Sequence, residues 1–307
     1  MKIYSSLFLS ILTLSGFGMG EASLAAAGRT LSTAKLLETG QPVKIVCFGD
    51  SITGVYYPTG GRRAWCDMLG IALHRIYPQA KIEMINAGIS GHTTSQALAR
   101  MDADVLRHHP QLVVVMFGMN DVVNNATGVS PEIFRANLAQ IVKRARAQGG
   151  EVILMTPNSI YSDDPRRAPW YLTDYVEIVR QVGKELEVPV TDCFRTYEAV
   201  RSVNRWAWVR LMSDSLHPNM RGHKVFAEEV AWTISGKRVS LADVPLLQPG
   251  LPRVLSRLRA QQPVKVIAMK PYDSLIGPAL QSLFPGAQIQ VTTWDANQKS
   301  LASIEAA

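Results

Sequence analysis

Three residues in this sequence can together make a serine hydroxyl reactive: Ser51, Asp214 and His217. A serine hydroxyl is a weak nucleophile at neutral pH, so it needs a base within hydrogen-bonding reach, and histidine suits that role because its pKa lies near working pH. An aspartate on the other side of the imidazole ring holds the correct tautomer and stabilises the imidazolium ion. Because Asp214 precedes His217 by three residues, one loop can bring both side chains together. The set predicts nucleophilic attack on an acyl carbon.

Such an attack places negative charge on the carbonyl oxygen, so hydrogen-bond donors must already point at that oxygen. The backbone N–H groups of Ser51 and Gly88 and the side-chain amide of Asn120 are the candidate donors. In measured oxyanion holes one donor contributes about 3 kcal/mol. Glycine at position 88 also permits a close approach of the backbone.

Two further acids adjoin these positions: Asp50 lies beside Ser51, and Asp121 lies beside Asn120. A pair of carboxylates is what glycoside cleavage requires, so the two acids offer a competing interpretation. Aspartates in turns commonly accept hydrogen bonds from their own backbone. We therefore expect Asp50 and Asp121 to order the loops that carry the serine and the asparagine.

Apolar stretches of strand length alternate with stretches of helical character along the chain. The strands are almost continuously apolar, which is typical of strands covered on both faces, and the alternation predicts a parallel sheet with helices on each side. Ligands of such sheets bind beyond the carboxyl ends of the strands, where Ser51 lies. Ser130, Pro131 and Glu132 form a typical helix start. The expected strands are 43–48, 81–86, 112–117, 151–156 and 188–191, and the expected helices are 62–76, 94–107, 131–148 and 170–186.

Four short motifs occur in order: Gly49-Asp50-Ser51, then Gly88, then Gly118-x-Asn120-Asp121, then Asp214-x-x-His217. They resemble the four blocks of the SGNH hydrolases, also called GDSL esterases or lipases, over roughly residues 43–234. The resemblance implies that Ser51 is the nucleophile and an oxyanion donor, that Gly88 and Asn120 complete the hole, and that His217 is the base with Asp214 as its partner. It also implies a three-layer α/β/α flavodoxin-like sandwich with a central parallel sheet, without metal or cofactor. The absence of a G-x-S-x-G elbow argues against an α/β-hydrolase.

The resemblance leaves the substrate open. We expect an esterase that removes short acyl groups, such as acetyl, from a polysaccharide or a small-molecule ester. An acyltransferase with the same triad, a lipase or lysophospholipase, and a non-catalytic binding module remain alternatives. Aromatic rings in or near the expected loops could stack on sugars or acyl chains, although most of them are expected in the core. Of these rings, Trp206 and Trp208 are expected nearest the site. The aromatic residues concerned are Tyr56, Tyr57, Trp65, Trp170, Tyr171, Trp206 and Trp208. Histidines outside the triad, among them His92 and His223, are expected to be solvated, although His92 could touch substrate.

The first 27 residues follow the order of a secretory signal: a lysine, an interrupted apolar run, then small residues. This order predicts an exported protein without a stable membrane anchor, periplasmic or extracellular. The formal charge of +7 is scattered, so nucleic-acid binding is not expected. Cys47, Cys66 and Cys193 allow one disulfide in three pairings, with Cys47 expected as a buried hydrophobe, and they are too dispersed for a metal site. The oligomeric state is left open.

The sequence after residue 240 contains an echo of its beginning. QPVKVIAM at 262–269 resembles QPVKIVCF at 41–48, and LFPGAQIQV at 283–291 resembles IYPQAKIEM at 76–84. Asp273-Ser274 lies two residues away from where Asp50-Ser51 would fall. The expected organisation is therefore a signal peptide (1–27), a hydrolase domain (28–240), and a connector with a small β-α-β-α extension (241–307) that reads as a degenerate repeat without an active site of its own.

Overall fold

The protein, seen in a computed structural model, is described for residues 31–54, 63–123, 128–161, 167–245 and 251–294. The chain divides into two compact units between Val244 and Pro245. Leu241 and Val244 are buried in the core of the first unit. The proposed signal peptide lies outside the described residues.

The first unit is built on a five-stranded parallel sheet with the strand order β2-β1-β3-β4-β5. Its strands lie close to the expected ranges, except that β5 is shorter than expected. The strands are β1 (Pro42–Gly49), β2 (Lys81–Gly88), β3 (Leu112–Met116), β4 (Glu151–Met155) and β5 (Val190–Thr191). Every residue of β3 is buried, which fits a central strand covered on both faces.

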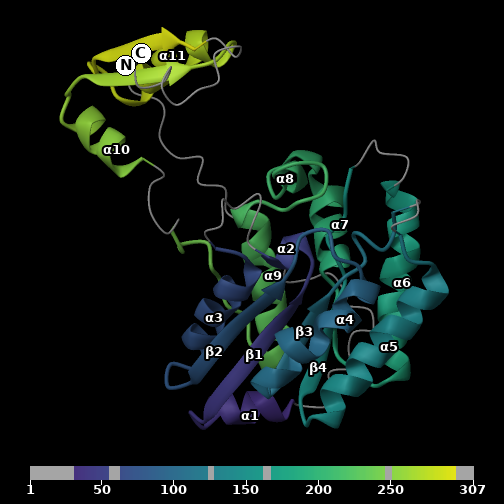
Figure 1. Cartoon of the computed structure of the whole chain (residues 1–307). Coiled ribbons are helices and arrows are strands. Elements are labelled where there is room, and N and C mark those ends of the chain that lie inside the picture. The colour runs from purple at the N-terminus through teal and green to yellow at the C-terminus, as the bar shows by residue number, and fades with distance from the viewer. Residues whose placement is uncertain (1–30, 55–62, 124–127, 162–166, 246–250, 295–307) are drawn as a thin grey trace. The chain divides into compact units, whose positions relative to one another are not determined.

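Helices cover both faces of this sheet, which confirms the predicted three-layer α/β/α fold (Figure 1). In one layer α3 (Trp65–Ile76) packs on α9 (Met220–Ser235), and α1 (Ser32–Glu38) and α7 (Cys193–Val203) also contact α9. In the other layer α5 (Pro131–Ala147) packs between α4 (Thr94–Asp104) and α6 (Pro169–Glu185). Two short helices, α2 (Ser51–Gly54) and α8 (Arg205–Val209), belong to connections between larger elements.

Local sequence signals explain where several helices begin and end. Ser130 caps α5 as expected, since its hydroxyl accepts the backbone N–H of Ile133 at 3.4 Å, and Pro131 opens the helix. The helix expected over 94–107 is instead α4 followed by a separate 3-10 turn, Leu106–His108. Pro110 follows directly after His109, and a residue before proline is disfavoured in helical conformation. Helices α1, α2, α7 and α8 were not expected.

The second unit contains α10 (Pro252–Arg259), β6 (Val264–Ala268), α11 (Tyr272–Leu283) and β7 (Ile289–Thr293). Its two strands pair in parallel, and its small core includes Leu258, Val264 and Ala287. The β-α-β part agrees with the expected extension. The last helix of that expectation lies outside the described residues.

The second unit shares features of its backbone geometry with the segment from α1 to β2. Val264 pairs with Ile289 in the same register as Val43 with Ile82. After α3 the cap residue Tyr77 has φ −129° and ψ 78°, and after α11 the cap residue Phe284 has φ −130° and ψ 79°. The two exit turns are therefore alike.

The likeness extends to the packing inside each segment. A side chain at Gly70 of α3 would meet Met84 at 3.0 Å, and one at Gly277 of α11 would meet Val291 at 3.4 Å. The difference lies in the connection from strand to helix. Residues 50–64 join β1 to α3, whereas only residues 269–271 join β6 to α11.

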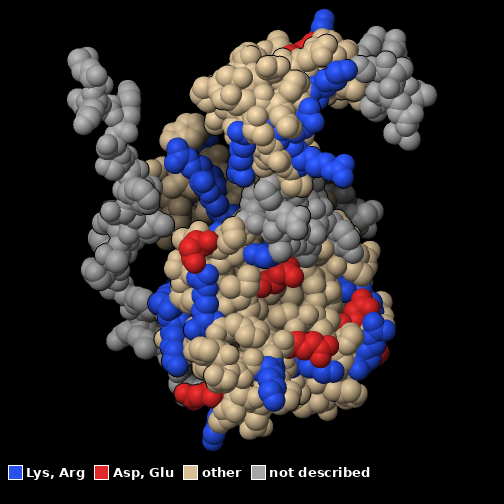
Figure 2. Space-filling model, turned by 90° about the vertical axis from the view of Figure 1, so that its left-hand side faces the viewer, with Lys and Arg blue, Asp and Glu red and all other residues tan. Residues whose placement is uncertain are grey.

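Charged side chains are distributed differently in the two units. On the face that Figure 2 shows, Lys and Arg of the first unit alternate with Asp and Glu. In the described part of the second unit five basic residues accompany one acidic residue, Asp273; the basic residues are Arg253, Arg257, Arg259, Lys265 and Lys270.

Candidate active site

The three residues that could form a triad lie within hydrogen-bonding distance of one another. Ser51 Oγ is 3.1 Å from Nε2 of His217. On the other side of the ring, Nδ1 of His217 is 2.9 Å from Oδ2 and 3.2 Å from Oδ1 of Asp214. A proton on Nδ1 donates to the carboxylate, so Nε2 is left to accept the serine hydroxyl proton. The side chains of His217 and Asp214 are 20% and 31% exposed, so solvent reaches this pair.

The loop that carries Asp214 and His217 is folded around the aspartate carboxylate. Asp214 Oδ1 accepts the backbone N–H groups of Leu216 and His217, each at 2.7 Å. Burial raises the pKa of Asp214, but the hydrogen bonds from these two N–H groups and from the His217 side chain outweigh it, so the pKa lies below its usual value. The carboxylate therefore stays ionised opposite the imidazole.

Two asparagines anchor this loop to the rest of the first unit. Asn219, the N-cap of α9, donates from Nδ2 to the carbonyls of Arg210 at 2.9 Å and Met212 at 3.0 Å. Asn158, buried after β4, donates to the Leu216 carbonyl at 2.9 Å. The histidine is thus held by backbone contacts on both sides of its loop.

Ser51 is the first residue of α2 and follows β1 after Asp50. Asp50 Oδ1 accepts the backbone N–H of Ile52 at 3.0 Å, and its carbonyl accepts that of Gly54 at 2.9 Å, so Asp50 forms the turn that presents Ser51. Burial raises the pKa of Asp50 to about 7, against the opposing Ile52 hydrogen bond and with a further contribution from the charge of Asp121. These contacts agree with a loop-ordering role for Asp50.

Gly88 lies directly against the helix that carries Ser51. A side chain at Gly88 would approach the backbone N of Gly54 to 2.3 Å. The Gly88 N–H donates to Asn86 Oδ1 at 3.0 Å, and Asn86 Nδ2 donates to the Thr53 carbonyl at 2.6 Å. The next backbone N–H, that of Ile89, donates to the Gly49 carbonyl on β1 at 3.1 Å, so the N–H of Gly88 points to the other side of β2, away from β1 and Ser51. The structure therefore does not bring the expected Gly88 donor together with Ser51 and Asn120.

Asn120 and Asp121 occupy the turn after β3. Asn120 Nδ2 donates one hydrogen to the His92 carbonyl at 3.1 Å, which leaves its second hydrogen for another acceptor. Asp121, 1% exposed, accepts the backbone N–H and hydroxyl of Thr94 at 2.8 and 2.6 Å and the N–H of Gly118 at 3.1 Å. Burial raises the pKa of Asp121, against these hydrogen bonds. Asp121 thus joins its turn to the start of α4.

Several residues that hold the site were not singled out from the sequence. Asn86 lies two residues before Gly88, but no sequence signal distinguished its amide as a bridge to α2. Asn158 and Arg100 carry no motif at all, and an arginine inside a helix usually extends into solvent. Arg167 donates to the Met119 carbonyl at 3.0 Å, beside Asn120. Only the three-dimensional contacts identify these residues.

The aromatic side chains fall into two groups. Trp65 and Trp208 are buried, whereas Trp170 and Trp206 are 68% and 72% exposed. Trp208 donates from its indole to Ser159 Oγ at 2.9 Å and packs edge-on against Tyr161, with ring centroids 5.1 Å apart. The backbone N–H of Tyr161 donates to the Ser215 carbonyl inside the Asp214 to His217 loop at 3.3 Å, so this pair adjoins the triad. Tyr56 and Tyr57 lie outside the described residues.

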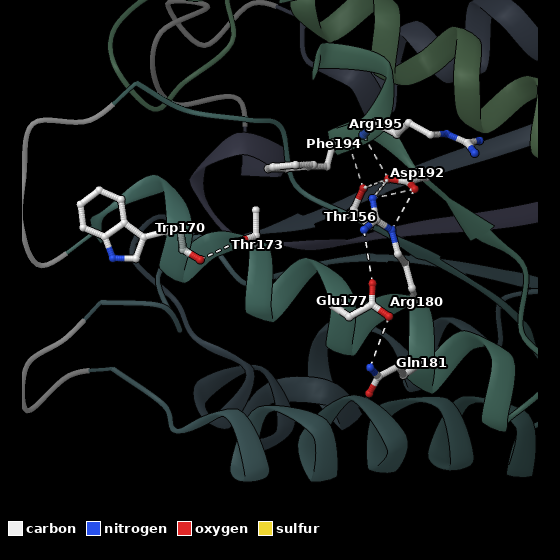
Figure 3. A network of polar contacts seen from close by, with 9 residues as sticks. All are labelled: Thr156, Trp170, Thr173, Glu177, Arg180, Gln181, Asp192, Phe194 and Arg195. Atoms are coloured by element: carbon white, nitrogen blue, oxygen red, sulfur yellow. Dashed lines mark hydrogen bonds and ion pairs between the residues drawn. The ribbon is translucent and has the colours of Figure 1, made fainter. Parts of the chain in front are cut away.

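A second polar network joins α6 to the ends of β4 and β5 (Figure 3). Arg180 binds Asp192 with two nitrogens, at 3.0 and 3.2 Å, and Glu177 contacts the same guanidinium at 3.4 Å. Asp192 also accepts the Thr156 hydroxyl at 3.1 Å, and Thr156 accepts the backbone N–H of Phe194 at 2.9 Å. These contacts join α6 to the strand ends, so the network connects the helix to the sheet. Figure 3 also shows Trp170, at the start of α6, whose carbonyl accepts the Thr173 hydroxyl.

One histidine differs from its expectation. His223, expected in solvent, is 1% exposed between α9 and α3, where its Nδ1 accepts the backbone N–H of Trp65 at 3.1 Å. The reason is its place on the face of α9 that packs on α3.

Cys47, Cys66 and Cys193 are free and buried, as expected for Cys47. Within the described ranges no cluster of three metal-ligating side chains occurs, and no helix is long and apolar enough to cross a membrane.

Comparisons with known proteins bear on the family and the fold of the chain. A family model described as the GDSL-like Lipase/Acylhydrolase family matches residues 47–225, more than half of the chain. An acetylxylan esterase of Geobacillus stearothermophilus is 29% identical over 210 residues, which cover 62% of this chain and 93% of that protein. The thioesterase 1/protease 1/lysophospholipase L1 of Escherichia coli K12 is 29% identical over 187 residues, which cover 61% and 81%. A crystal structure of the Geobacillus acetylxylan esterase matches with a TM-score of 0.53 and 26% identity over 62% of this chain and 94% of the other.

The parallel α/β/α sandwich and these relatives define the class of protein, a carboxylic ester hydrolase. More closely, the chain belongs to the GDSL-like lipase/acylhydrolase family, the SGNH hydrolases. The resemblance drawn from the four sequence motifs is thereby confirmed.

Proposed function

We propose that the protein is an exported serine esterase in which Ser51, His217 and Asp214 form the catalytic triad. The observation that carries the proposal is the 3.1 Å separation of Ser51 Oγ and His217 Nε2, with Asp214 on the opposite ring nitrogen. This arrangement gives a serine hydroxyl a base and gives the base an orienting carboxylate.

In the acylation half-reaction, His217 Nε2 takes the proton of Ser51 as Oγ attacks the ester carbonyl carbon. Asp214 stabilises the resulting imidazolium through the Nδ1 hydrogen. His217 then donates the proton to the alcohol oxygen as the bond from the acyl carbon to that oxygen breaks. The products of this half-reaction are the free alcohol and an acyl ester on Ser51.

In the deacylation half-reaction, water takes the place of the alcohol. His217 removes a proton from the water as its oxygen attacks the acyl carbon, and the same proton returns to Ser51 Oγ when the ester bond breaks. The carboxylic acid leaves, and the free enzyme is restored. An acyltransferase would differ only in using an acceptor hydroxyl in place of water.

The negative charge of both tetrahedral intermediates is stabilised by hydrogen bonds from the backbone N–H of Ser51 and from the second amide hydrogen of Asn120. The contact from Asn120 to the His92 carbonyl fixes the amide plane, so its remaining hydrogen has a set direction. Asp50 and Asp121 support these donors by ordering the two turns from which they extend.

The substrate we propose is a short acyl ester, in particular an acetyl group on a carbohydrate. The acetylxylan esterase that this chain resembles over 93% of its length supports this class. A second support is the aromatic pair beside the triad loop, in which Tyr161 is 37% exposed. An exposed ring can pack against the apolar face of a sugar.

The proposal is tested by initial rates of hydrolysis of p-nitrophenyl acetate, butyrate and octanoate. These rates are compared between the wild-type protein, Ser51→Ala and Ser274→Ala. Ser274 is a matched control because it also follows an aspartate in the first turn of a helix. We expect Ser51→Ala to abolish hydrolysis, Ser274→Ala to leave it unchanged, and acetate to be preferred. Activity that survives in a folded Ser51→Ala protein would contradict the nucleophile assignment, and a preference for octanoate would favour the lipase or lysophospholipase alternative. Release of acetate from acetylated xylo-oligosaccharides then tests whether acetylated carbohydrates are the natural class of substrate.

We also propose that residues 1–27 are a signal peptide, that residues 28–240 contain the whole catalytic machinery, and that residues 241–307 include a degenerate, non-catalytic copy of the first α-β-α-β segment. Support for the last point is the shared register and exit turn of the two segments. Secretion of the full chain, and its loss when residues 2–27 are removed, tests the first point.

A further inference from the structure

One arginine contacts the backbone at the ends of two catalytic strands. Arg100 of α4, whose side chain is 11% exposed, donates from Nη2 to the Gly49 carbonyl at 2.9 Å and from Nη1 to the Ala87 carbonyl at 2.8 Å. Gly49 is the last residue of β1 before the Asp50-Ser51 turn, and Ala87 directly precedes Gly88. The guanidinium therefore joins the two strand ends from which Ser51 and Gly88 extend.

The third contact of Arg100 leads to the second oxyanion donor. Its Nε donates to Nδ1 of His92 at 3.1 Å, and the carbonyl of the same histidine accepts Asn120 Nδ2 at 3.1 Å. Since Nδ1 accepts a hydrogen bond, the ring proton of neutral His92 lies on Nε2. Burial, together with the positive charge of Arg100, lowers the pKa of His92, so the ring remains an acceptor for Arg100.

Two further contacts fix the guanidinium plane. Nη1 of Arg100 also forms an ion pair with Asp104 at 3.0 Å, one helical turn further along α4. The guanidinium carbon lies 4.6 Å from the centroid of the Phe48 ring, within the range of a cation–π contact. A lysine at this position would keep the charge, but it lacks the planar fork needed to reach both carbonyls and the imidazole together.

We propose that Arg100 is a positioning residue that keeps two oxyanion donors aligned, the Ser51 N–H through the end of β1 and the Asn120 amide through His92. The inference rests on the proposed triad chemistry and adds to it a requirement outside the four motifs. One side chain contacts the main chain beside Ser51, the main chain beside Gly88 and the ring of the residue that orients Asn120. Displacement of this side chain misaligns donors whose contribution depends on distances held to a fraction of an ångström.

The test compares Arg100→Lys and Arg100→Gln with Arg144→Lys and Arg144→Gln. Arg144 of α5 is a matched control, because it also donates to a backbone carbonyl of α4, Leu98, at 3.0 Å and pairs with an aspartate, Asp102, at 2.6 Å. We expect kcat for p-nitrophenyl acetate to fall by about 10- to 100-fold in both Arg100 variants, with KM changed less than about threefold. The Arg144 variants are expected to keep wild-type kcat and KM.

A second readout separates positioning from a merely structural role. A fluorophosphonate probe forms a bond from phosphorus to Ser51 Oγ with loss of fluoride, and its phosphoryl oxygen stands in for the oxyanion. If Arg100 positions the donors, the rate constant for labelling falls in parallel with kcat while the labelled fraction stays near one. If Arg100 serves only folding, the labelled fraction falls and the rate constant remains that of wild type, which would overturn the proposal.

The outcome for Ser51 distinguishes failure of this inference from failure of the proposed function. Wild-type rate constants in both Arg100 variants, with Ser51→Ala inactive, would reject the role of Arg100 and leave the triad intact. Full activity in Ser51→Ala would reject the triad and the role of Arg100 with it.

Discussion

Asp214 holds His217 at two points: its Oδ2 lies 2.9 Å from the ring Nδ1, and its Oδ1 accepts the backbone N–H of the same histidine at 2.7 Å. The carboxylate thus fixes both the ring and the main chain from which the ring extends. The two functions can be separated by experiment, because an asparagine keeps an acceptor oxygen for the backbone and loses the charge opposite the ring.

Asp214→Asn should therefore reduce kcat while preserving the fold. The Oδ1 of asparagine can still accept the N–H groups of Leu216 and His217, but its NH₂ group favours the wrong imidazole tautomer. We expect kcat/KM to fall on the order of 10³- to 10⁴-fold, as in triads where this change has been made. Steady-state kinetics and thermal unfolding check this. Asp243→Asn, which removes an exposed partner of Arg75, is the control and should leave kcat/KM unchanged. A small kinetic effect at Asp214 would show that the carboxylate serves only to order its loop.

Gly88→Ala should displace the helix that carries Ser51. The added methyl group would lie 2.3 Å from Gly54 N and 2.6 Å from the Thr53 carbonyl carbon, which are backbone atoms that cannot rotate away. We expect at least about a 100-fold loss of kcat and an unfolding free energy lower by about 1–3 kcal/mol. Gly149→Ala in the turn after α5 is the control: its φ of 81° costs some strain, but no atom beyond its own and the two neighbouring residues lies within 4 Å of the new Cβ. Equal kinetic losses in both variants would argue against the close contact at Gly88.

His223 predicts a loss of stability in mild acid. Burial holds the pKa of His223 at about 3, with a further lowering by the charge of His217. The unfolded histidine titrates near 6.5, so its contribution to stability is complete above that pH and is lost as the pH falls toward 3, by at most about 1.4 kcal/mol per unit. The free energy of unfolding in urea should therefore differ less between pH 7.5 and pH 5 in His223→Gln than in the wild type. The glutamine amide oxygen can still accept the Trp65 N–H. Exposed His74, changed to Gln, should retain the wild-type difference.

Asp50 predicts the opposite pH dependence. Its pKa of about 7 lies above the unfolded value near 3.9, so ionisation of the buried carboxyl opposes folding as the pH rises from about 4 to 7. Asp50→Asn retains an acceptor for the Ile52 N–H and removes this cost. We expect the variant to be more stable than wild type at pH 8, by at most about 4 kcal/mol, with the gap closing toward pH 4. The exposed Asp174→Asn should show no such gap. A variant less stable than wild type at pH 8 would mean that the Asp50 charge is stabilised by its surroundings.

The sheet of the first unit was predictable because its strands are almost continuously apolar and alternate with helices. Short elements were not predictable. α2 has four residues and no apolar periodicity, and its conformation depends on Asp50, which accepts hydrogen bonds from the turn that follows it. β5 is shortened to two residues, although the apolar stretch from Val188 is longer.

The triad positions were readable from the motif order, whereas the residues that hold them were not. Ser51 and His217 are 166 positions apart. Ser51 follows β1, whereas His217 lies in the loop between α8 and α9, which Asn158 holds to the chain after β4. The residues that hold the site bind backbone carbonyls or another side chain; they are Arg100, Asn86 and Asn158. Every residue has a backbone carbonyl, so the sequence does not indicate which carbonyl accepts a hydrogen bond. The burial of His223 was predicted wrongly, because residue type alone does not distinguish a histidine on the packed face of α9 from one on its exposed face.

The geometry shared by the two segments bears on how much the catalytic connection constrains the elements around it. The same strand register and the same helix exit form whether fifteen residues (50–64) or three (269–271) join strand to helix. The strand register and the helix exit of this segment are therefore compatible with strand-to-helix connections of very different length. A long connection, such as the one that contains Ser51, can be accommodated while the strand, helix and strand around it keep their geometry.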